Sequence, residues 1–270
     1  MPERPAEVRR RLEELGVRPS KDWGQSFLVD PFVADAEAAL VELGPGRPVL
    51  EVGGGLGILT AALLRRGLGP VTVIERDRRL AGYLRSTFGD RVSVVEGDAL
   101  RVPLPPAAAV VGNLPYSVAT PILVRLLELR VPRWVALVQR EVAERLAAGP
   151  GSKPYGRLAL LARLYGTVEL YRTVPAESFW PVPEVESRIV VHVARTDGLP
   201  VPSAARFERI VRALFSARRK QLGNLLPRLV TDGRSARDLA SAAGWPAEWA
   251  RLRPEDLSPD AFFALARELG

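Results

Sequence analysis

Apolar runs alternate with amphipathic stretches through the first half of the chain. Five runs have the length and the boundaries of buried strands: 47–53, 70–77, 91–100, 107–116 and 133–140. Four further stretches place apolar residues at the spacing of one helix face: 31–43, 56–67, 78–89 and 119–130. Strands and helices that alternate with short connections are typical of a parallel, doubly wound α/β sheet, which is the fold class that we predict.

The pattern changes after residue 140. The remaining stretches divide into helices at 141–148 and 157–165, two closing strands expected to pair antiparallel at 166–174 and 187–195, and helices throughout 204–270. A charged helix is expected at 3–15, and loops at 19–30 and 175–187. The segment 196–203 is the best linker candidate. We therefore predict two domains, 1–200 and 201–270, of which the second is small and all α.

Composition excludes several kinds of chemistry. The 270 residues include no cysteine and a single histidine, His192. Disulfides and thiolate ligands are therefore impossible, no metal site is expected, and His192 is interpreted as a structural residue. No apolar run approaches the ~18 residues of a membrane span, and the first residues lack a signal-peptide pattern. We expect a cytoplasmic protein with no membrane contact.

The chain is basic, with 38 basic and 31 acidic residues. A positive balance favours a polyanionic partner such as nucleic acid. A general arginine-rich composition would give the same balance, so the charge alone does not decide between the two.

A glycine-rich turn follows the first strand run. Gly53, Gly55 and Gly57 form G-x-G-x-G, whereas a dinucleotide fingerprint would need glycine at position 58, which is Ile58. Glycines at this place let the backbone approach a ligand at a helix start. The spacing resembles the S-adenosylmethionine (SAM) loop of class I methyltransferases, although a glycine turn without a ligand would look the same.

Acidic residues end the next two strand runs. Glu75 ends the second run, where a carboxylate can accept hydrogen bonds from both ribose hydroxyls of a nucleotide. Asp98 ends the third run, where a carboxylate can accept a hydrogen bond from an adenine amine. Because ligands bind at the carboxyl ends of strands in such sheets, both acids are predicted to face a cofactor.

The fourth strand run ends in Asn113-Leu114-Pro115-Tyr116. This tetrapeptide resembles the (N/D/S)-P-P-(Y/F) motif of amino-group methyltransferases. An exocyclic adenine amine is a poor nucleophile, because its lone pair is delocalised into the ring. The Asn113 oxygen and a backbone carbonyl near Leu114 could accept its two N–H groups, and Tyr116 could stack on an extruded base.

The chain as a whole resembles the KsgA/RsmA-type ribosomal RNA adenine dimethyltransferases over about residues 20–230. The matching stretches are 24–30 (GQSFLVD), 49–60 (VLEVGGGLGILT), 97–100 (GDAL), 112–117 (GNLPYS), 138–145 (VQREVAER), 155–158 (YGRL), 179–187 (FWPVPEVES) and 215–222 (FSARRKQL). The resemblance implies a Rossmann-like class I SAM-dependent methyltransferase sheet.

Site residues carry over from this family position by position. The implied cofactor residues, with Gly55 added from the glycine turn, are Ser26, Leu28, Gly53, Gly55, Glu75, Asp98 and Asn113. The implied target-base residues are Asn113, Leu114, Pro115, Tyr116 and Phe179. Two positions depart from the family pattern, since Ser26 stands where asparagine is usual and Gly54 where proline is common.

The resemblance also implies a partner and a reaction. The expected activity is dimethylation of two adjacent adenosines in the 3′-terminal hairpin loop of small-subunit rRNA, within a pre-ribosomal particle and by a monomer. Seven basic residues and one acidic residue lie between positions 206 and 228, and among them Arg218, Arg219 and Lys220 are predicted to contact RNA. A large-subunit rRNA methyltransferase and a non-catalytic RNA-binding assembly or transcription factor remain alternatives.

Overall fold

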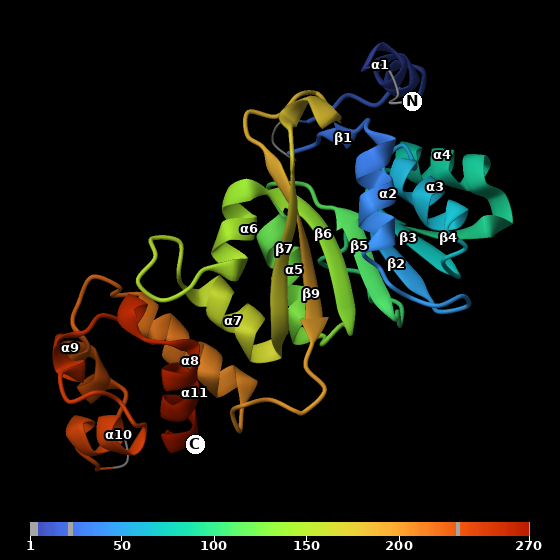
Figure 1. Ribbon diagram of the computed structural model, residues 1–270. Helices are drawn as coiled ribbons and strands as arrows, with labels where there is room; N and C mark the ends of the chain where they lie inside the picture. Colours follow the sequence, from blue (N-terminus) through green and yellow to red (C-terminus); the bar gives the residue numbers. More distant parts are fainter. Residues whose placement is uncertain (1–4, 21–23, 231–232, 270) are drawn as a thin grey trace. The chain divides into compact units, whose positions relative to one another are not determined.

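The computed structural model describes residues 5–20, 24–230 and 233–269. The chain forms two compact units: unit 1 contains 1–143 and 168–194, and unit 2 contains 144–167 and 195–270. The chain passes between them within α6 (Arg140–Ala147) and near the start of β7 (Gly166–Val174) (Figure 1). The domain boundary predicted after residue 200 lies close to residue 195, where the chain re-enters unit 2. The sequence did not predict that residues 144–167 also belong to unit 2.

Unit 1 is built on a seven-stranded sheet with the order β4-β3-β2-β5-β6-β9-β7. Besides β7, its strands are β2 (Val49–Val52), β3 (Val71–Glu75), β4 (Val92–Glu96), β5 (Ala109–Asn113), β6 (Arg133–Gln139) and β9 (Ser187–Ala194). The strands from β4 to β6 run parallel, and β9 is antiparallel to β6. The predicted α/β class is confirmed, and every apolar run gives one strand.

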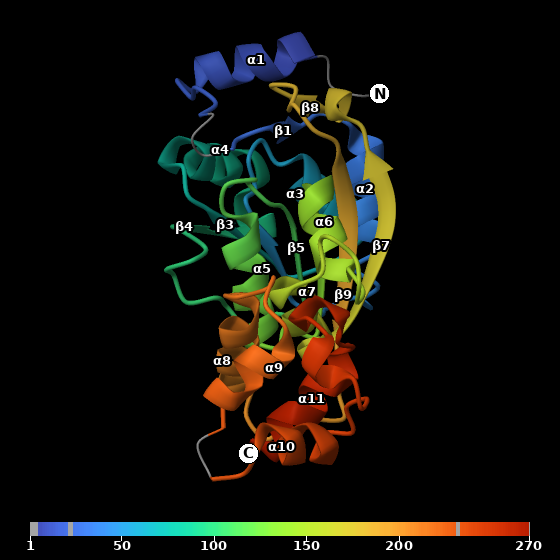
Figure 2. The ribbon, with the colours of Figure 1, turned by 90° about the vertical axis from the view of Figure 1, so that its left-hand side faces the viewer.

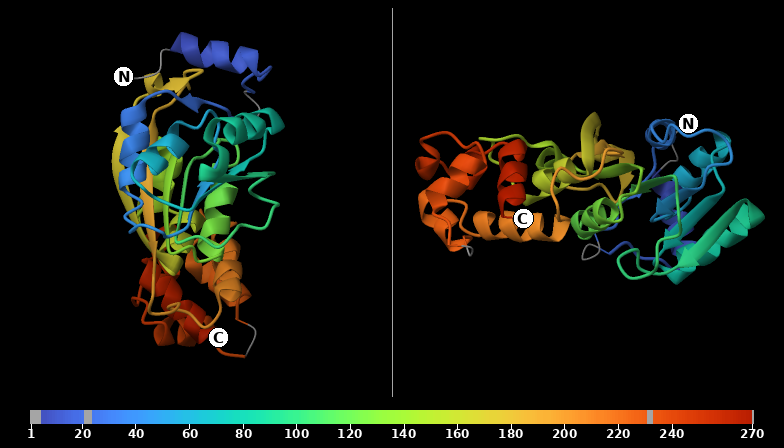
Figure 3. Two further views of the ribbon diagram at one scale, coloured as in Figure 1. Left: turned by 90° about the vertical axis from the view of Figure 1, so that its right-hand side faces the viewer. Right: turned by 90° about the horizontal axis from the view of Figure 1, so that it is seen from below.

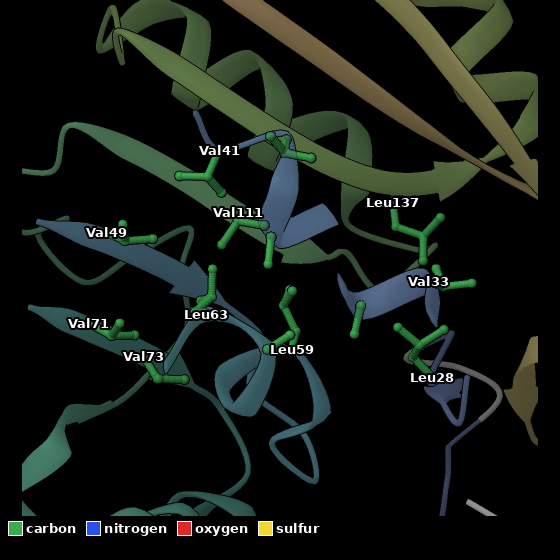
Figure 4. Packing of buried hydrophobic residues seen from close by; sticks show 14 of the residues in the cluster. Leu28, Val33, Val41, Val49, Leu59, Leu63, Val71, Val73, Val111 and Leu137 are labelled. Atoms are coloured by element: carbon green, nitrogen blue, oxygen red, sulfur yellow. The ribbon is translucent and has the colours of Figure 1, made fainter. Parts of the chain in front are cut away.

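Helices cover this sheet and bury its apolar side chains. The helices are α2 (Pro31–Ala39), α3 (Ile58–Arg65), α4 (Arg78–Phe88) and α5 (Ala119–Glu128). One buried cluster joins α2, α3 and α4 to the sheet, and Figure 4 shows Leu59 and Leu63 side by side, with Val49 and Val73 on the neighbouring strands. Each fully buried side chain of this size contributes about 1.5–3 kcal/mol of transfer free energy. This packing fixes the strand ends on which the candidate site depends.

A small two-stranded sheet was not expected. β1 (Phe27–Leu28) pairs antiparallel with β8 (Phe179–Trp180), inside two segments that the sequence favours as loops (Figure 2). Nearby, α1 (Pro5–Glu14) buries Val8 and Leu12 in a cluster that includes Phe27. Strands of two residues are too short to show alternating periodicity, which explains why the pattern did not reveal them.

Unit 2 is helical. Its helices are α7 (Arg157–Tyr165), α8 (Ala204–Phe215), α9 (Leu222–Leu225), α10 (Ala236–Ala242) and α11 (Pro259–Glu268) (Figure 3). The ring of Phe215 lies 6.2 Å from that of Tyr155 and 5.9 Å from that of Phe262. The buried Tyr155 hydroxyl donates to the Leu257 carbonyl at 3.0 Å. Across the described ranges of both units, no helix combines the length and the apolar character that a membrane span requires.

Candidate active site

A pocket in unit 1 opens where the parallel strands end. Its lining comes from the residues around β1 and from the turns that follow β2, β3, β4 and β5, including 24–28, 51–56, 74–77, 97–99 and 113–118. β2 lies between β3 and β5, so the strand order reverses here. Such a reversal splays the connections apart and creates the usual ligand crevice of an open α/β sheet.

The glycine turn forms one wall of the pocket. Gly53, Gly55 and Gly57 have φ angles of 81°, 53° and 82°, a region that side chains strongly disfavour. A Cβ on Gly55 would lie 3.3 Å from the Phe27 ring. The predicted Gly53 and Gly55 both line the pocket, with their backbones open to a ligand.

The departure at Gly54 has a packing explanation. A Cβ at this position would lie 2.5 Å from Cγ1 of Val73 and 2.7 Å from Cδ1 of Leu84. Neighbouring side chains therefore occupy the space that any larger residue would need, including the proline common in the resembling family. Glycine is the residue that this core accepts.

Glu75 is held rigidly at the end of β3. Its Oε2 accepts from the Gly55 N–H at 2.9 Å and its Oε1 from the Asp77 N–H at 2.9 Å. Burial raises the pKa of Glu75, although these N–H groups oppose the shift. Each oxygen keeps a second lone pair, so the carboxylate remains able to accept ribose hydroxyls.

Three other predicted cofactor residues also line the pocket. Asp98 follows β4, and its Oδ1 accepts from the Leu100 N–H at 2.9 Å. Leu28 of β1 contributes an apolar side chain, and Ser26 lies next to it. The end of β3 and the turn after β4 thus present two carboxylates to the same space.

Asn113 is oriented by the backbone of residue 26. Its Nδ2 donates to the Ser26 carbonyl at 3.3 Å. With the amide nitrogen engaged in this way, Oδ1 is the end left to accept a hydrogen bond from a ligand. The contact uses the main chain of Ser26, so the departure from asparagine at that position leaves this link intact.

Tyr116 is fixed by a residue far along the chain. Its hydroxyl lies 2.7 Å from Oγ of Ser187, the first residue of β9. Gly24 approaches the same turn so closely that a Cβ would lie 3.1 Å from the Tyr116 nitrogen. Leu114, Pro115 and Tyr116 all line the pocket, as predicted. Ser187 ends the matching stretch 179–187, but nothing in the sequence places it against Tyr116.

Phe179 lies elsewhere. It is 1% exposed, belongs to the core cluster beneath the sheet helices and is not part of the pocket lining. It pairs with Leu28 across the short β1–β8 sheet. The structure therefore brings every predicted site residue to the pocket except Phe179, whose contact with a target base stays a prediction.

Glu51 is a lining residue that was not among the predicted ones. It lies on β2, is 0% exposed, and its Oε2 accepts from the Thr60 hydroxyl at 2.6 Å. Its Oε1 has no hydrogen-bond partner. Burial raises the pKa of Glu51 to about 8, and the charge of Glu75 acts in the same direction. Glu51 stands between apolar residues inside a run predicted as a buried strand, so nothing in the sequence placed it in the site.

Comparison with known proteins identifies the family. The family model described as ribosomal RNA adenine dimethylase matches residues 17–241. The chain belongs to the ribosomal RNA adenine dimethylase family. The ribosomal RNA small subunit methyltransferase A of Anaeromyxobacter dehalogenans strain 2CP-C is 41% identical over 100% of both chains. The probable enzyme of that name from Natronomonas pharaonis is 41% identical over 94% of each chain.

Solved structures support the same assignment. A dimethyladenosine transferase from Plasmodium falciparum superposes with a TM-score of 0.77 at 25% identity, over 88% of this chain and 95% of that one. The 23S rRNA methyltransferase ErmE superposes with a TM-score of 0.70 at 28% identity, over 90% and 99%. This adenine dimethylase therefore has the class I methyltransferase fold, and SAM is its cofactor.

The pocket fits that cofactor chemically. The glycine turn leaves room for a ligand against the backbone, and the carboxylates of Glu75 and Asp98 suit a nucleoside. The unpartnered Oε1 of Glu51 suits the positive charges of the sulfonium and ammonium groups. Within the described residues, no group of three or more potential ligands could hold a metal ion.

The three basic residues at 218–220 in unit 2 have different surroundings. The Arg218 guanidinium pairs with Glu255 and donates to the Lys153 carbonyl at 2.9 Å. Arg219 and Lys220 are exposed. Arg218 thus holds its own unit together, and the two residues after it are the better placed to meet an outside partner.

Proposed function

We propose that this protein transfers methyl groups from SAM to the N6 amines of two adjacent adenosines in the 3′-terminal hairpin loop of small-subunit rRNA. The observation that carries the proposal is the orientation of Asn113, whose amide nitrogen is held by Ser26 while the pocket contains Glu75 and Asp98. The full-length relatives named small subunit methyltransferase A support the choice of rRNA.

The chain's residues have separate tasks in this reaction. Bound SAM supplies an electrophilic methyl group. Asn113 Oδ1 and the backbone carbonyl at Leu114 accept the two amine N–H groups, which favours a pyramidal nitrogen with its lone pair directed at that methyl. Tyr116, anchored by Ser187, offers a flat face on which the extruded adenine stacks. The proton of the methylated amine leaves to water, so no basic side chain is required.

RNA recognition is assigned to both units. Arg219 and Lys220 supply exposed positive charge for the phosphate backbone, and Arg218 supports them structurally. We expect the substrate to be a pre-ribosomal particle in the cytoplasm, bound by one copy of the chain. Phe179 remains proposed as a base contact, which requires a rearrangement that exposes its ring in the RNA complex.

The test is methyl transfer from radiolabelled SAM onto small subunits that lack these modifications, followed by nucleoside analysis and primer extension. We expect N6,N6-dimethyladenosine at two adjacent positions near the 3′ end. Large subunits are the matched control, because the likeness to ErmE favours a large-subunit rRNA as the second candidate. Label confined to large-subunit rRNA would select that candidate. Transfer to neither subunit would favour a non-catalytic RNA-binding factor.

A further inference from the structure

A short turn follows β4 and carries Asp98 into the cofactor pocket. The Asp98 carbonyl accepts from the N–H groups of Arg101 at 2.8 Å and Val102 at 2.9 Å, and its Oδ1 accepts from the Leu100 N–H at 2.9 Å. Asp98 and Ala99 both line the pocket. A turn this short cannot satisfy its later carbonyls from its own N–H groups, so these carbonyls need donors from elsewhere.

Arg125 of α5 donates to two of these carbonyls. Its Nη1 donates to the Ala99 carbonyl, and its Nη2 donates to the Val102 carbonyl at 2.8 Å. A guanidinium group presents its N–H groups in a rigid planar fork, so one side chain can hold two carbonyls at once. Val102 also lies so close to Gly97 that a Cβ on Gly97 would overlap it. The turn is therefore fixed against both α5 and the end of β4.

The helix that carries Arg125 is itself firmly placed beside the pocket. Val118 and Ile122 line the pocket, and Leu123 and Leu126 of α5 are buried. Arg125 follows Ile122 by three residues, which places it on the same side of the helix one turn further along. Arg125 is partly buried and is not part of the pocket lining. Its effect on a ligand must therefore pass through the turn that it holds.

We propose that Arg125 is a positioning residue for cofactor selectivity, which holds the turn after β4 so that Asp98 meets the 6-amino group of the SAM adenine. Oδ1 of Asp98 is engaged by the Leu100 N–H, and its other oxygen is left to accept from the amine. A purine without this amine would leave that oxygen without a donor. The proposal deepens the proposed function and rests on SAM as the cofactor.

The test compares two ligands by calorimetry, without RNA. One is S-adenosylhomocysteine, and the other is its analogue in which hydrogen replaces the 6-amino group. We expect wild type to prefer the amino ligand by about tenfold or more, because a site built around a hydrogen bond rejects a ligand that lacks the donor. Arg125→Met keeps an apolar stem but loses both donors, and it should reduce this preference to about threefold or less.

Two further variants show whether the effect passes through Asp98. Arg85→Met is the matched control, since Arg85 of α4 donates to the Val94 carbonyl of β4 at 3.2 Å and lies outside the pocket lining. This variant should keep the wild-type preference. Asp98→Ala should lose the preference, and adding Arg125→Met to it should change the remaining ratio by less than about twofold, because the two residues act as one unit.

Three results would overturn the proposal. An equal loss of affinity for both ligands in Arg125→Met would make Arg125 a residue of general stability. An undiminished preference in that variant would mean that the turn keeps its place without the arginine. Equal binding of the two ligands by wild type would mean that Asp98 does not contact the amine.

A fallback variant covers the case in which Arg125→Met does not fold. Arg125→Gln keeps one amide donor in place of the fork, and the same ratio of affinities decides. Since RNA is absent from all these titrations, a failure of the rRNA assignment would leave their results unchanged, and the two failures are distinguishable.

Discussion

At the scale of single residues, a hydrogen bond to the backbone decides which end of the Asn113 amide is left for a ligand. Its amide could present either end to the pocket, and the Ser26 carbonyl selects which by accepting from Nδ2. With Nδ2 held by that carbonyl, Oδ1 remains as the acceptor that an adenine amine requires. The sequence predicts the residue from its motif, but the orienting carbonyl comes from a segment far away in the chain.

Asn113→Ala should abolish most methyl transfer while leaving RNA binding nearly intact, because the lost group only orients the amine. Single-turnover methylation and a filter-binding assay separate the two effects. Asn224→Ala, at an exposed asparagine of unit 2, is the matched control and should be active. Turnover of Asn113→Ala at the wild-type rate would exclude the orienting role.

Glu75→Ala should weaken SAM binding by about 1–3 kcal/mol, the usual loss of a hydrogen bond to a charged group. Calorimetry without RNA measures this loss. Glu96→Ala is a suitable comparison, because Glu96 pairs in register with Glu75 on the neighbouring strand but is exposed and does not line the pocket. Equal affinities for both variants would remove Glu75 from the cofactor site.

Gly54→Ala should destabilise the protein by about 1–3 kcal/mol, because its Cβ would overlap Val73 and Leu84. Urea denaturation gives the free energy of unfolding. Gly44→Ala provides the reference, since a Cβ there meets nothing within 4 Å. If the two alanine variants unfolded at the same urea concentration, the close packing around Gly54 would not explain the missing proline.

At the scale of elements, the sequence predicted the long strands correctly and missed the short ones. The strands from β2 to β6 were found from apolar runs, and their ends supplied Glu75, Asp98 and Asn113. β1 and β8 were missed because two residues have no period. Phe179 pairs with Leu28 and lies in the core of this structure, and its contact with a target base stays a prediction.

The turn after α8 gives a prediction about RNA binding. Replacing Arg219 and Lys220 with alanine should reduce the slope of log affinity against log salt by about 1.4–1.8, at about 0.7–0.9 per lost phosphate contact. SAM affinity should not change. Arg218→Ala should instead destabilise unit 2, because Glu255 and the Lys153 carbonyl lose their partner.

A control pair tests whether position matters. Arg237 and Arg251 are also exposed in unit 2 but lie outside the basic stretch. Their double alanine variant should keep a salt slope close to that of wild type. Equal slope changes in both double variants would mean that the RNA senses the net charge of the protein, and that residues 219 and 220 form no specific contact.

At the scale of the whole molecule, contacts between residues far apart in the sequence determine which segments belong to each unit and which acids are buried. The helical segment 144–167 looks like a continuation of the α/β alternation, but it belongs to unit 2, where Tyr155 contacts Leu257 and Phe215. Likewise, Glu51 is the one charged residue of an apolar strand, and Glu37 follows Asp35 in a helix whose other residues are apolar. Their burial depends on how α2 and α3 pack on the sheet, which no local pattern encodes.

The buried acids predict an unusual dependence of stability on pH. Burial raises the pKa of Glu37, Glu51 and Glu75 above the ordinary 4.5, so between that value and the raised ones the folded protein binds protons that the unfolded chain has released. Each such group therefore lowers the free energy of unfolding by about 1.4 kcal/mol per pH unit as the pH rises through this window.

The Glu37→Leu variant, measured without cofactor, should be more stable than wild type at pH 8, and the advantage should shrink toward pH 5. Urea denaturation at pH 5, 6.5 and 8 gives the difference, in which the titrations common to both proteins cancel. An advantage that stayed constant across these pH values would mean that the leucine merely packs better, and that Glu37 binds no extra proton in the folded state.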